Sequence, residues 1–572
     1  MKKILSVLLS AAIIIGVVGI GVCAEEREPD LGFAVASDLH YNVPADELEG
    51  DIDDEIYWYA NRRASMDNES GFIIDAFLEQ CANDPDCDFV LIPGDMVDHG
   101  RRIIQEHYDV AEKFAEFEKR TGKQVYVIDG NHDIGNDETA TTYQDFKRIY
   151  YQFGYDEALT TVDENCSYTA NLGDKYRLIA LDSCDVNKST EDGLTTDRLS
   201  WVLEHARQAK SDGRYPILMM HHNLLDHLPI QRIISRNFIV RFHYSTAELL
   251  ADSGVKLVFT GHEHCSDAAT YTSALGNKIY DFATTALSMY PIEYRMFTLT
   301  DDEINYTAKE VESIDTDTLR ERVSGYSDEQ IALMNEDLNA YAKGFLKAGV
   351  RYRLELSLSM EKMGISPDAF YYDIVKTAVD GLTDILEMPL YGENSVQTLA
   401  AEYGIDIPDS DYQNAWDLAT ELVSAHYAGS EAYDLESTEV TIFLRTIALI
   451  LRTDLAAVSD EIFFKAANAL LADMGIESIA DELTKLGVSA YGPVTPGEYF
   501  LLAIASPLLY KFAYDSDGVD DNNGTLEGYG TTSIKTNVDN ISENIQNIKS
   551  TVALYINMFL KYLIKITEIF IK

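Results

Sequence analysis

The chain has 572 residues, of which 46% are hydrophobic and 25% are charged. This composition supports a large core, and the length exceeds that of one ordinary domain. The 45 Lys and Arg against 96 Asp and Glu give a formal net charge of −51 at pH 7, which would repel the phosphate backbone of long nucleic acids. We therefore predict two or more domains and no polymeric nucleic acid as a partner.

The N-terminus has the three-part pattern of a secretory signal peptide. Lys2 and Lys3 precede an apolar run over residues 4–22, and the small residue Ala24 is followed by charged residues. We expect cleavage near Ala24, with residues 1–24 as the signal peptide, and a secreted or cell-surface (extracytoplasmic) protein. The alternatives are a retained membrane anchor, for which the run is just long enough, and a lipid anchor on Cys23.

The cysteines give an ambiguous signal. Cleavage at this position would leave five of them, at Cys81, Cys87, Cys166, Cys184 and Cys265. An odd number cannot all pair within one chain. Cys81 and Cys87 flank a short polar turn, and they either form a disulfide in an oxidising compartment or remain a free buried pair. Since no CxxC arrangement is present, we expect no thiolate zinc site.

Residues 31 to about 300 alternate between short apolar runs and helical patterns. The runs are typical of buried strands and lie at 33–36, 89–92, 125–128, 178–181, 217–220, 257–259 and 279–282. Helical patterns separate several of them, at 71–81, 103–119 and 196–209. This alternation predicts a layered α/β domain over residues 25–311, with its chemistry at one edge of the sheet.

The C-terminal half has a different pattern of apolar and polar residues. Long amphipathic segments at 328–347, 369–386, 411–426 and 439–451 predict an all-helical domain over 312–512. Residues 513–550 are rich in Asp, Asn and Gly and are interpreted as a polar linker, with a calcium loop in its DSDGVDDNNG stretch as a weaker alternative. Residues 551–572 predict a C-terminal amphipathic helix that docks on the helical domain, a membrane surface or a second copy of the chain.

Five short motifs with oxygen and imidazole ligands follow predicted strands. In chain order they are Asp38-Leu39-His40, Gly94-Asp95-Met96-Val97-Asp98, Gly130-Asn131-His132-Asp133, His221-His222 and Gly261-His262-Glu263-His264. Open α/β sheets place their sites at the carboxyl ends of strands, where such loops converge. Carboxylates and neutral imidazoles suit zinc, manganese and iron, and two such ions could clamp a phosphoryl group. Each motif alone is weak, but the ordered set predicts a two-metal site with Asp95 as the bridging ligand.

This ordered set resembles the calcineurin-like metallophosphoesterase superfamily, whose motifs are DxH, GDxxD, GNH[DE], a strand-end H and GHxH. The resemblance covers residues 31 to about 300 and implies a layered α/β/β/α sandwich that precedes the helical domain. It implies two divalent or di/trivalent metal ions, manganese, iron or zinc. By the resemblance, one metal is held by Asp38, His40, Asp95 and His264, and the other by Asp95, Asn131, His221 and His262.

The same resemblance places His132 near the leaving group, with Asp133 orienting it. An imidazole with a pKa near neutrality can protonate a departing alkoxide, and a neighbouring carboxylate fixes its tautomer. His221 is preferred to His222 because the family's ligand ends the strand. Asp98 stands where purple acid phosphatases carry a tyrosine, so a purple enzyme is not implied.

These features favour a secreted dinuclear-metal phosphoesterase, with a small-molecule phosphate ester as its substrate. The motif Asp38-Leu39-His40-Tyr41 and the paired histidines are more similar to the cyclic-nucleotide and glycerophosphodiester branch, which favours a phosphodiesterase for small or lipid-derived esters. The alternatives are a nucleotidase or phosphomonoesterase, and a surface binding protein with a secondary metal domain. Four arginines either contact phosphate or are solvated surface residues: Arg62, Arg63, Arg101 and Arg102.

Overall fold

The computed structural model describes residues 31–43, 64–135, 140–186, 188–227, 231, 237–357, 376, 380, 383–434, 437–453 and 518–530. The predicted signal peptide, most of the predicted linker and the predicted C-terminal helix lie outside these residues. Among the helices that the structure describes, none combines the length and the apolar character needed to cross a membrane.

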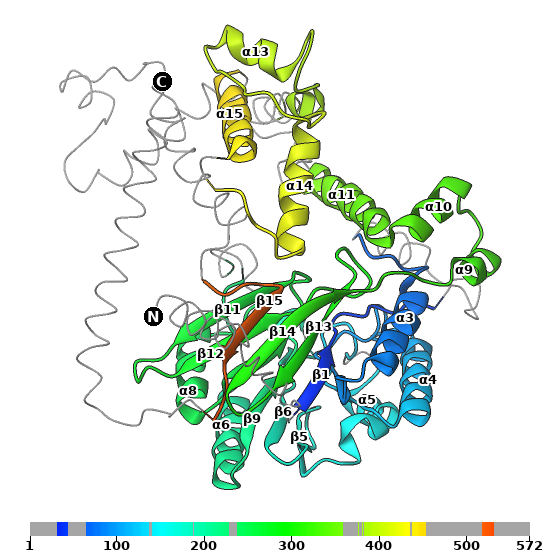
Figure 1. The fold of residues 1–572 in the computed structure, drawn as a ribbon, viewed down its shortest axis with the longest axis vertical. Helices are drawn as coiled ribbons and strands as arrows, with labels where there is room; N and C mark the ends of the chain where they lie inside the picture. The colour runs from blue at the N-terminus through cyan, green and yellow to red at the C-terminus, as the bar shows by residue number, and fades with distance from the viewer. Residues whose placement is uncertain are drawn as a thin grey trace, which may run out of the picture.

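Two mixed sheets are built from residues 31–310 and one strand near the C-terminus (Figure 1). The strands of the six-stranded sheet, in spatial order, are β15 (Asn523–Glu527), β14 (Glu303–Glu310), β13 (Glu293–Leu299), β1 (Leu31–Val35), β2 (Phe89–Ile92) and β3 (Gln124–Val127). Those of the seven-stranded sheet are β11 (Asp267–Thr272), β12 (Lys278–Ala283), β10 (Leu257–Thr260), β9 (Tyr215–Met219), β6 (Tyr176–Ala180), β5 (Tyr168–Leu172) and β4 (Thr160–Thr161). Strands β7 (Cys184–Asp185) and β8 (Lys188–Asp192) form a small separate ladder.

Aromatic side chains from the two sheets meet in the main core. Phe33 of β1 lies 5.5 Å from Phe259 of β10, and Phe297 of β13 lies 5.0 Å from Phe282 of β12, measured between ring centroids. Helices α3 (Ser70–Asn83) and α4 (Ile104–Thr121) lie beside β1 to β3, and α5 (Tyr143–Ile149) follows β3 (Figure 1). Helices α6 (Thr196–Ser211) and α8 (His243–Ser253) pack on the seven-stranded sheet. The predicted α/β class is therefore confirmed, and each of the seven predicted strands overlaps an observed strand.

The C-terminal half contributes described helices of two kinds. They are α9 (Thr316–Arg322), α10 (Asp328–Glu336), α11 (Leu338–Ser357), α13 (Val396–Glu402), α14 (Ala415–Tyr427) and α15 (Thr438–Arg452). Helices α9, α10 and the start of α11 pack into the main core, whereas α13, α14 and α15 share a separate hydrophobic cluster. The single helix predicted over 328–347 is divided at Asp337, whose backbone is extended at φ −157° and whose carboxylate accepts a hydrogen bond from the N–H of Ala340. Most of the predicted helix at 369–386 lies outside the described residues.

The predicted polar linker is wrong for the part that the structure describes. Residues 523–527 form β15, which pairs antiparallel with β14 at the edge of the six-stranded sheet. An edge strand can expose many of its side chains, so its polar sequence lacked the apolar alternation that predicts strands. In the preceding turn, carboxylate oxygens of Asp520 and Asp521 accept hydrogen bonds from backbone N–H groups, which gives those side chains a structural role in place of the calcium loop considered above.

The cysteines in the described part of the chain are all buried and free. Cys81 and Cys87 are close enough for their thiols to interact, and no disulfide joins them. Burial raises the pKa of Cys81 well above its usual value, which favours an unreactive thiol. Cys81 therefore behaves as a small apolar core side chain, whereas its hydrogen bond lowers the pKa of Cys87.

Candidate metal centre

The structure brings all seven predicted metal ligands to one edge of the molecule. They lie just beyond the carboxyl ends of β1, β2, β3, β9 and β10 and thus come from both sheets. Backbone hydrogen bonds join the loops that carry them. The N–H of Asp38 donates to the carbonyl oxygen of Gly94, and that of Gly261 donates to the carbonyl oxygen of His221. The loops therefore form one connected surface.

The backbone is strained at most of these positions. Eight non-glycine residues in the described part of the chain have positive φ, and five of these are predicted ligands: Asp38, His40, Asp95, His262 and His264. Their φ values lie between 41° and 67°, in the left-handed region that costs an L-residue about 1–2 kcal/mol. Such strain persists only where the surrounding structure imposes it, and it is concentrated at functional sites.

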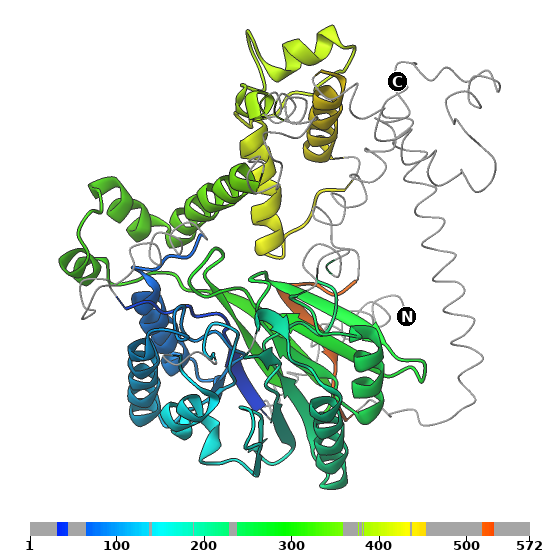
Figure 2. The same cartoon turned by 180° about the vertical axis from the view of Figure 1, so that it is seen from behind.

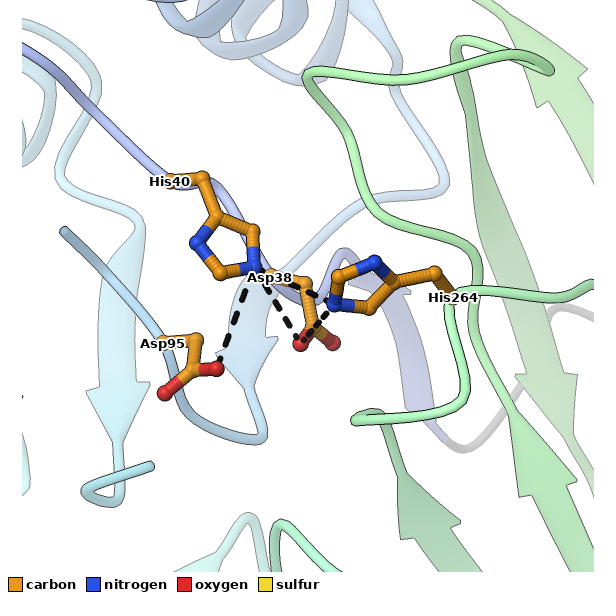
Figure 3. A group of neighbouring side chains, drawn as sticks. All are labelled: Asp38, His40, Asp95 and His264. Atoms are coloured by element: carbon orange, nitrogen blue, oxygen red, sulfur yellow. Dashed lines mark hydrogen bonds and ion pairs between the residues drawn. The ribbon is translucent and has the colours of Figure 1, made fainter. Parts of the chain in front are cut away.

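The first group of ligands consists of Asp38, His40, Asp95 and His264, whose side chains converge as Figure 3 shows. His40 Nε2 and His264 Nε2 are 3.1 Å apart, and His264 Nε2 is 3.2 Å from Asp38 Oδ1. His40 Nε2 also lies 3.8 Å from Asp95 Oδ2. Two imidazole nitrogens and two carboxylates that face one point are a suitable ligand set for a transition metal ion.

The second group is built around the same Asp95. His221 Nε2 lies 3.3 Å from Asp95 Oδ2, 3.0 Å from Asn131 Oδ1 and 3.2 Å from His262 Nδ1. Among the described residues, no donor is hydrogen-bonded to Asp95 Oδ2, although the side chain is fully buried. A buried carboxylate oxygen without a hydrogen bond is costly, and a cation on each side of it would remove that cost. The residues therefore fit two metal ions with Asp95 between them.

Electrostatics favour the metal-binding forms of Asp95, His262 and His264, whereas the raised pKa of His221 favours its protonated form. Burial opposes the ionisation of Asp95, but the imidazoles of His221 and His132 hold its pKa well below the usual range. Burial lowers the pKa of His262 and of His264, which favours neutral imidazoles. Against burial, Asp95 and Asp38 raise the pKa of His221 to about 10, so the carboxylates stabilise a positive charge at this point, whether a proton or a metal ion.

Two glycines beside the ligands are required by close approach. A Cβ at Gly130 would lie 2.1 Å from Asp95 Oδ1, and one at Gly261 would lie 2.1 Å from Asp38 Oδ2. Any side chain at these positions would displace a carboxylate of the centre. The glycines in the GNH and GHxH motifs thus leave room for ligands that come from other motifs.

His132 is held by Asp98, which corrects the role predicted for Asp133. His132 Nδ1 lies 2.8 Å from the carbonyl oxygen of Asp98 and 3.5 Å from its carboxylate. Asp133 is buried, and its carboxylate accepts hydrogen bonds from the N–H groups of Gly130 and Val97. Burial and the nearby Asp95 raise the pKa of Asp133 well above its usual value. Asp133 therefore stabilises the turns of two motifs, because its carboxylate oxygens accept hydrogen bonds from backbone N–H groups in both.

Asp98 also contacts the first ligand group. Its Oδ1 lies 2.9 Å from His40 Nδ1, so the carboxylate of Asp98 orients a ligand while its backbone carbonyl holds the residue near the leaving group. His99 and Glu106 extend this network, with Glu106 Oε2 accepting the N–H of His99 at 2.8 Å. The sequence showed Asp98 within the GDxxD motif but not its partners. Glu106, on helix α4, had no sequence signal beyond a charged residue in the first turn.

The centre opens toward solvent on one side. The side chains of His132 and His264 are 26% and 22% exposed, whereas those of Asp95 and His221 are almost completely buried. A substrate would therefore approach past His132. Of the four arginines considered above, Arg101 and Arg102 are in the described part: the guanidinium of Arg101 donates to the carbonyl oxygens of Asn131 and Val186, and Arg102 is exposed.

The structure distinguishes the two adjacent histidines. His221 reaches Asp95, while His222 lies behind it, with Nδ1 3.0 Å from the hydroxyl of Ser183. This arrangement agrees with the choice of His221 as the ligand.

Comparisons with known proteins are consistent with this geometry. Residues 31–266 match the family model described as calcineurin-like phosphoesterase. Among solved structures, a dimetal phosphatase from Danio rerio aligns with a TM-score of 0.35 and 12% sequence identity, covering 50% of this chain and 97% of that chain. This structural likeness is too low to carry an argument. Comparison with curated proteins gives no match.

Proposed function

Because residues 31–266 form a domain of the calcineurin-like phosphoesterase family, we propose that this chain is an exported phosphodiesterase for small or lipid-derived esters. The domain is a metal-dependent phosphoric ester hydrolase. The observation that carries the proposal is the sharing of Asp95 between two ligand groups, one with His40 and one with His221. Such an arrangement suits two ions that act on one phosphoryl group.

The chain's own residues have separable tasks in this reaction. When bound, two metal ions polarise the phosphoryl oxygens and lower the pKa of a water molecule. The seven ligands hold that pair of ions in place. Asp98 holds Nδ1 of His132, so that Nε2 can carry the proton that is delivered to the departing alkoxide. The partial exposure of His132 supports this role because the leaving group must reach it from solvent.

Charge supports a diester over a monoester. If both ions are divalent, the ligand carboxylates of Asp38 and Asp95 together with the nearby carboxylate of Asp98 would leave about one net positive charge. That charge matches a monoanionic diester better than a dianionic monoester. The whole chain, with a net charge of −51, also repels a dianion more strongly.

The diester preference is tested by measuring kcat/KM for bis-p-nitrophenyl phosphate and p-nitrophenyl phosphate with added manganese. We expect the diester to be the better substrate. When histidines of the metal centre are substituted, His205→Ala serves as the matched control, because His205 lies on α6, away from the centre. A higher kcat/KM for the monoester would reject the diesterase proposal and favour a phosphomonoesterase or nucleotidase.

The metals are proposed to be manganese, iron or zinc, since imidazole and carboxylate ligands accept each of them. Metal analysis of protein purified from its native source would identify which ions are bound.

Export is proposed from Lys2, Lys3, the apolar run over 4–22 and Ala24. Mass spectrometry of the mature protein from the extracytoplasmic fraction is expected to find a chain that begins at Glu25. A chain that retains residues 1–24 would contradict cleavage and favour a membrane anchor.

A further inference from the structure

The loop that carries His264 contacts the last turn of helix α14. The N–H of Ser266, two residues beyond His264, donates to the carbonyl oxygen of Tyr427 at 2.9 Å. Just beyond α14, a Cβ at Gly429 would lie 2.3 Å from the carbonyl oxygen of Ser266, and the backbone of Gly429 is left-handed at φ 55°. The absence of a side chain at Gly429 therefore permits this close approach. Figures 1 and 2 both show the end of α14 directed at the sheets.

A second segment of the C-terminal half contacts both the end of α14 and the loop that carries His264. Asn522 Nδ2 donates to the carbonyl oxygens of Ala428 and Gly429, at 2.8 and 3.1 Å. Its Oδ1 accepts a hydrogen bond from the hydroxyl of Ser266 at 3.0 Å. Asn522 thus connects the end of α14 to the metal-ligand loop, and it belongs to the turn that leads into β15.

A buried arginine lies at the centre of this junction. Arg295 is 1% exposed, and its Nη2 donates to the hydroxyl of Ser266 and to the carbonyl oxygen of Asp521. Burying a guanidinium is costly unless its hydrogen bonds are made, so these contacts specify one arrangement of the three segments. On the other side of the loop, the hydroxyl of Thr285 donates to the carbonyl oxygen of His264 at 3.0 Å.

We propose that the last turn of α14 and the turn at 520–522 position the loop that carries His262 and His264 for metal binding. The helical half is then a positioning part of the metal centre and not a separate module. Groups behind the ligands orient them, and their loss weakens metal affinity even though they do not touch the ion. This role goes beyond the proposed substrate, because it applies to any ester that the centre cleaves.

The first test is Gly429→Ala, whose methyl group must push the carbonyl of Ser266 away. Manganese bound per chain is measured by equilibrium dialysis, independently of activity, together with the thermal midpoint. We expect half-saturation at a free manganese concentration about 10-fold higher than in the unmodified chain. Gly344→Ala is the matched control, since Gly344 lies in α11 with nothing within 4 Å of its added Cβ. It should bind manganese as the unmodified chain does.

A second variant decides the question if Gly429→Ala does not fold. Asn522→Ala removes the link between α14 and the loop, whereas Asn523→Ala changes the adjacent residue, which bonds to Thr307 on β14. Asn522→Ala should weaken manganese binding, and Asn523→Ala should not. The proposal is overturned if Asn522→Ala binds manganese with unchanged affinity while its thermal midpoint falls, since the contacts would then serve stability alone.

Discussion

The two carboxylate oxygens of Asp95 have different partners. Oδ1 accepts the N–H of His132 at 2.8 Å, and Oδ2 faces His40 and His221. One side chain therefore joins both ligand groups to the backbone of the residue near the leaving group. This position explains why the left-handed backbone of Asp95 is retained despite its cost.

His132→Ala should separate chemistry from metal binding. The backbone of His132, which meets Asp95, is unchanged by this substitution, while the proton donor is lost. We expect kcat to fall by about 10²–10⁴-fold with manganese content unchanged. Turnover and metal analysis on the same preparation check this. Loss of bound metal from the variant would mean that His132 is itself a ligand.

Asp98→Asn and Asp133→Asn should have different effects, since the carboxylate of Asp98 contacts the rings of His40 and His132, whereas that of Asp133 accepts backbone N–H groups. Asp98→Asn should lower kcat by about 10–100-fold, because the amide orients the ring of His40, a metal ligand, less firmly, while the backbone carbonyl that contacts His132 Nδ1 is retained. Asp133→Asn should chiefly lower the thermal midpoint, because its oxygens accept N–H groups of Gly130 and Val97. Kinetics and thermal unfolding of both variants test this. If both variants lost the same factor in kcat and kept the same thermal midpoint, Asp133 would be the residue that orients His132, as the sequence predicted.

The free energy of unfolding should depend on pH because of the buried carboxyl group of Glu293. Burial raises the pKa of Glu293 to about 7 from its model-compound value of 4.5, with Arg295 opposing the shift. Between these values the unfolded chain has lost a proton that the folded chain keeps, so stability falls as pH rises through this window. The loss is on the order of 2–3 kcal/mol by pH 7.

Glu293→Gln cannot titrate, so its free energy of unfolding should exceed that of the unmodified chain increasingly from pH 4.5 to 7. Denaturant titrations at several pH values measure this difference. A constant difference across the window would contradict the raised pKa.

At the scale of elements, β15 and the residues after it connect the two sheets. Tyr529 is buried, its ring stacks on Tyr215 at 4.8 Å between centroids, and its hydroxyl donates to the carbonyl oxygen of Pro216 at 3.1 Å. β15 itself belongs to the other sheet. Residues 523–529, which the sequence pattern assigned to a linker, are therefore a structural part of the first domain.

Tyr529→Ala should destabilise the first domain if this segment is built into it. We expect a loss of about 3–5 kcal/mol in the free energy of unfolding from the cavity and lost ring contacts. Tyr529→Phe, the control, should lose only the two hydrogen bonds of the hydroxyl, one to Pro216 and one from the N–H of Leu257, about 1–3 kcal/mol. Stability within error of the unmodified chain for Tyr529→Ala would mean that the segment is loosely attached.

The strands that sequence reasoning found are mostly continuous apolar runs, whereas several that it missed, including β11, β13 and β15, are interrupted by polar residues. Buried central strands such as β2 and β10 are continuous apolar runs, which are visible in a sequence. β11, with the sequence DAATYT, and β15, with NGTLE, lie at sheet edges and carry few apolar residues. β15 pairs with β14, a partner distant in the chain that local patterns do not report, whereas β11 pairs with the next strand, β12.

At the scale of the whole molecule, the ligand set was readable because each ligand follows a strand within a short motif. The contacts that position the ligand loops could not be predicted from the sequence in the same way. Ser266 and Asn522 are 256 positions apart and are joined only by the fold. The orienting role of Asp98 likewise depends on the approach of two loops, which spacing within a motif does not give.

The most direct test of the account is to measure metal content and ester hydrolysis together, for the unmodified chain and for Asp95→Asn. The account predicts two manganese ions per chain and metal-dependent turnover of bis-p-nitrophenyl phosphate. In Asp95→Asn it predicts weakened binding of both ions and loss of turnover, because both ligand groups share this carboxylate. Two tightly bound ions in Asp95→Asn, or none in the unmodified chain, would contradict the shared two-metal centre.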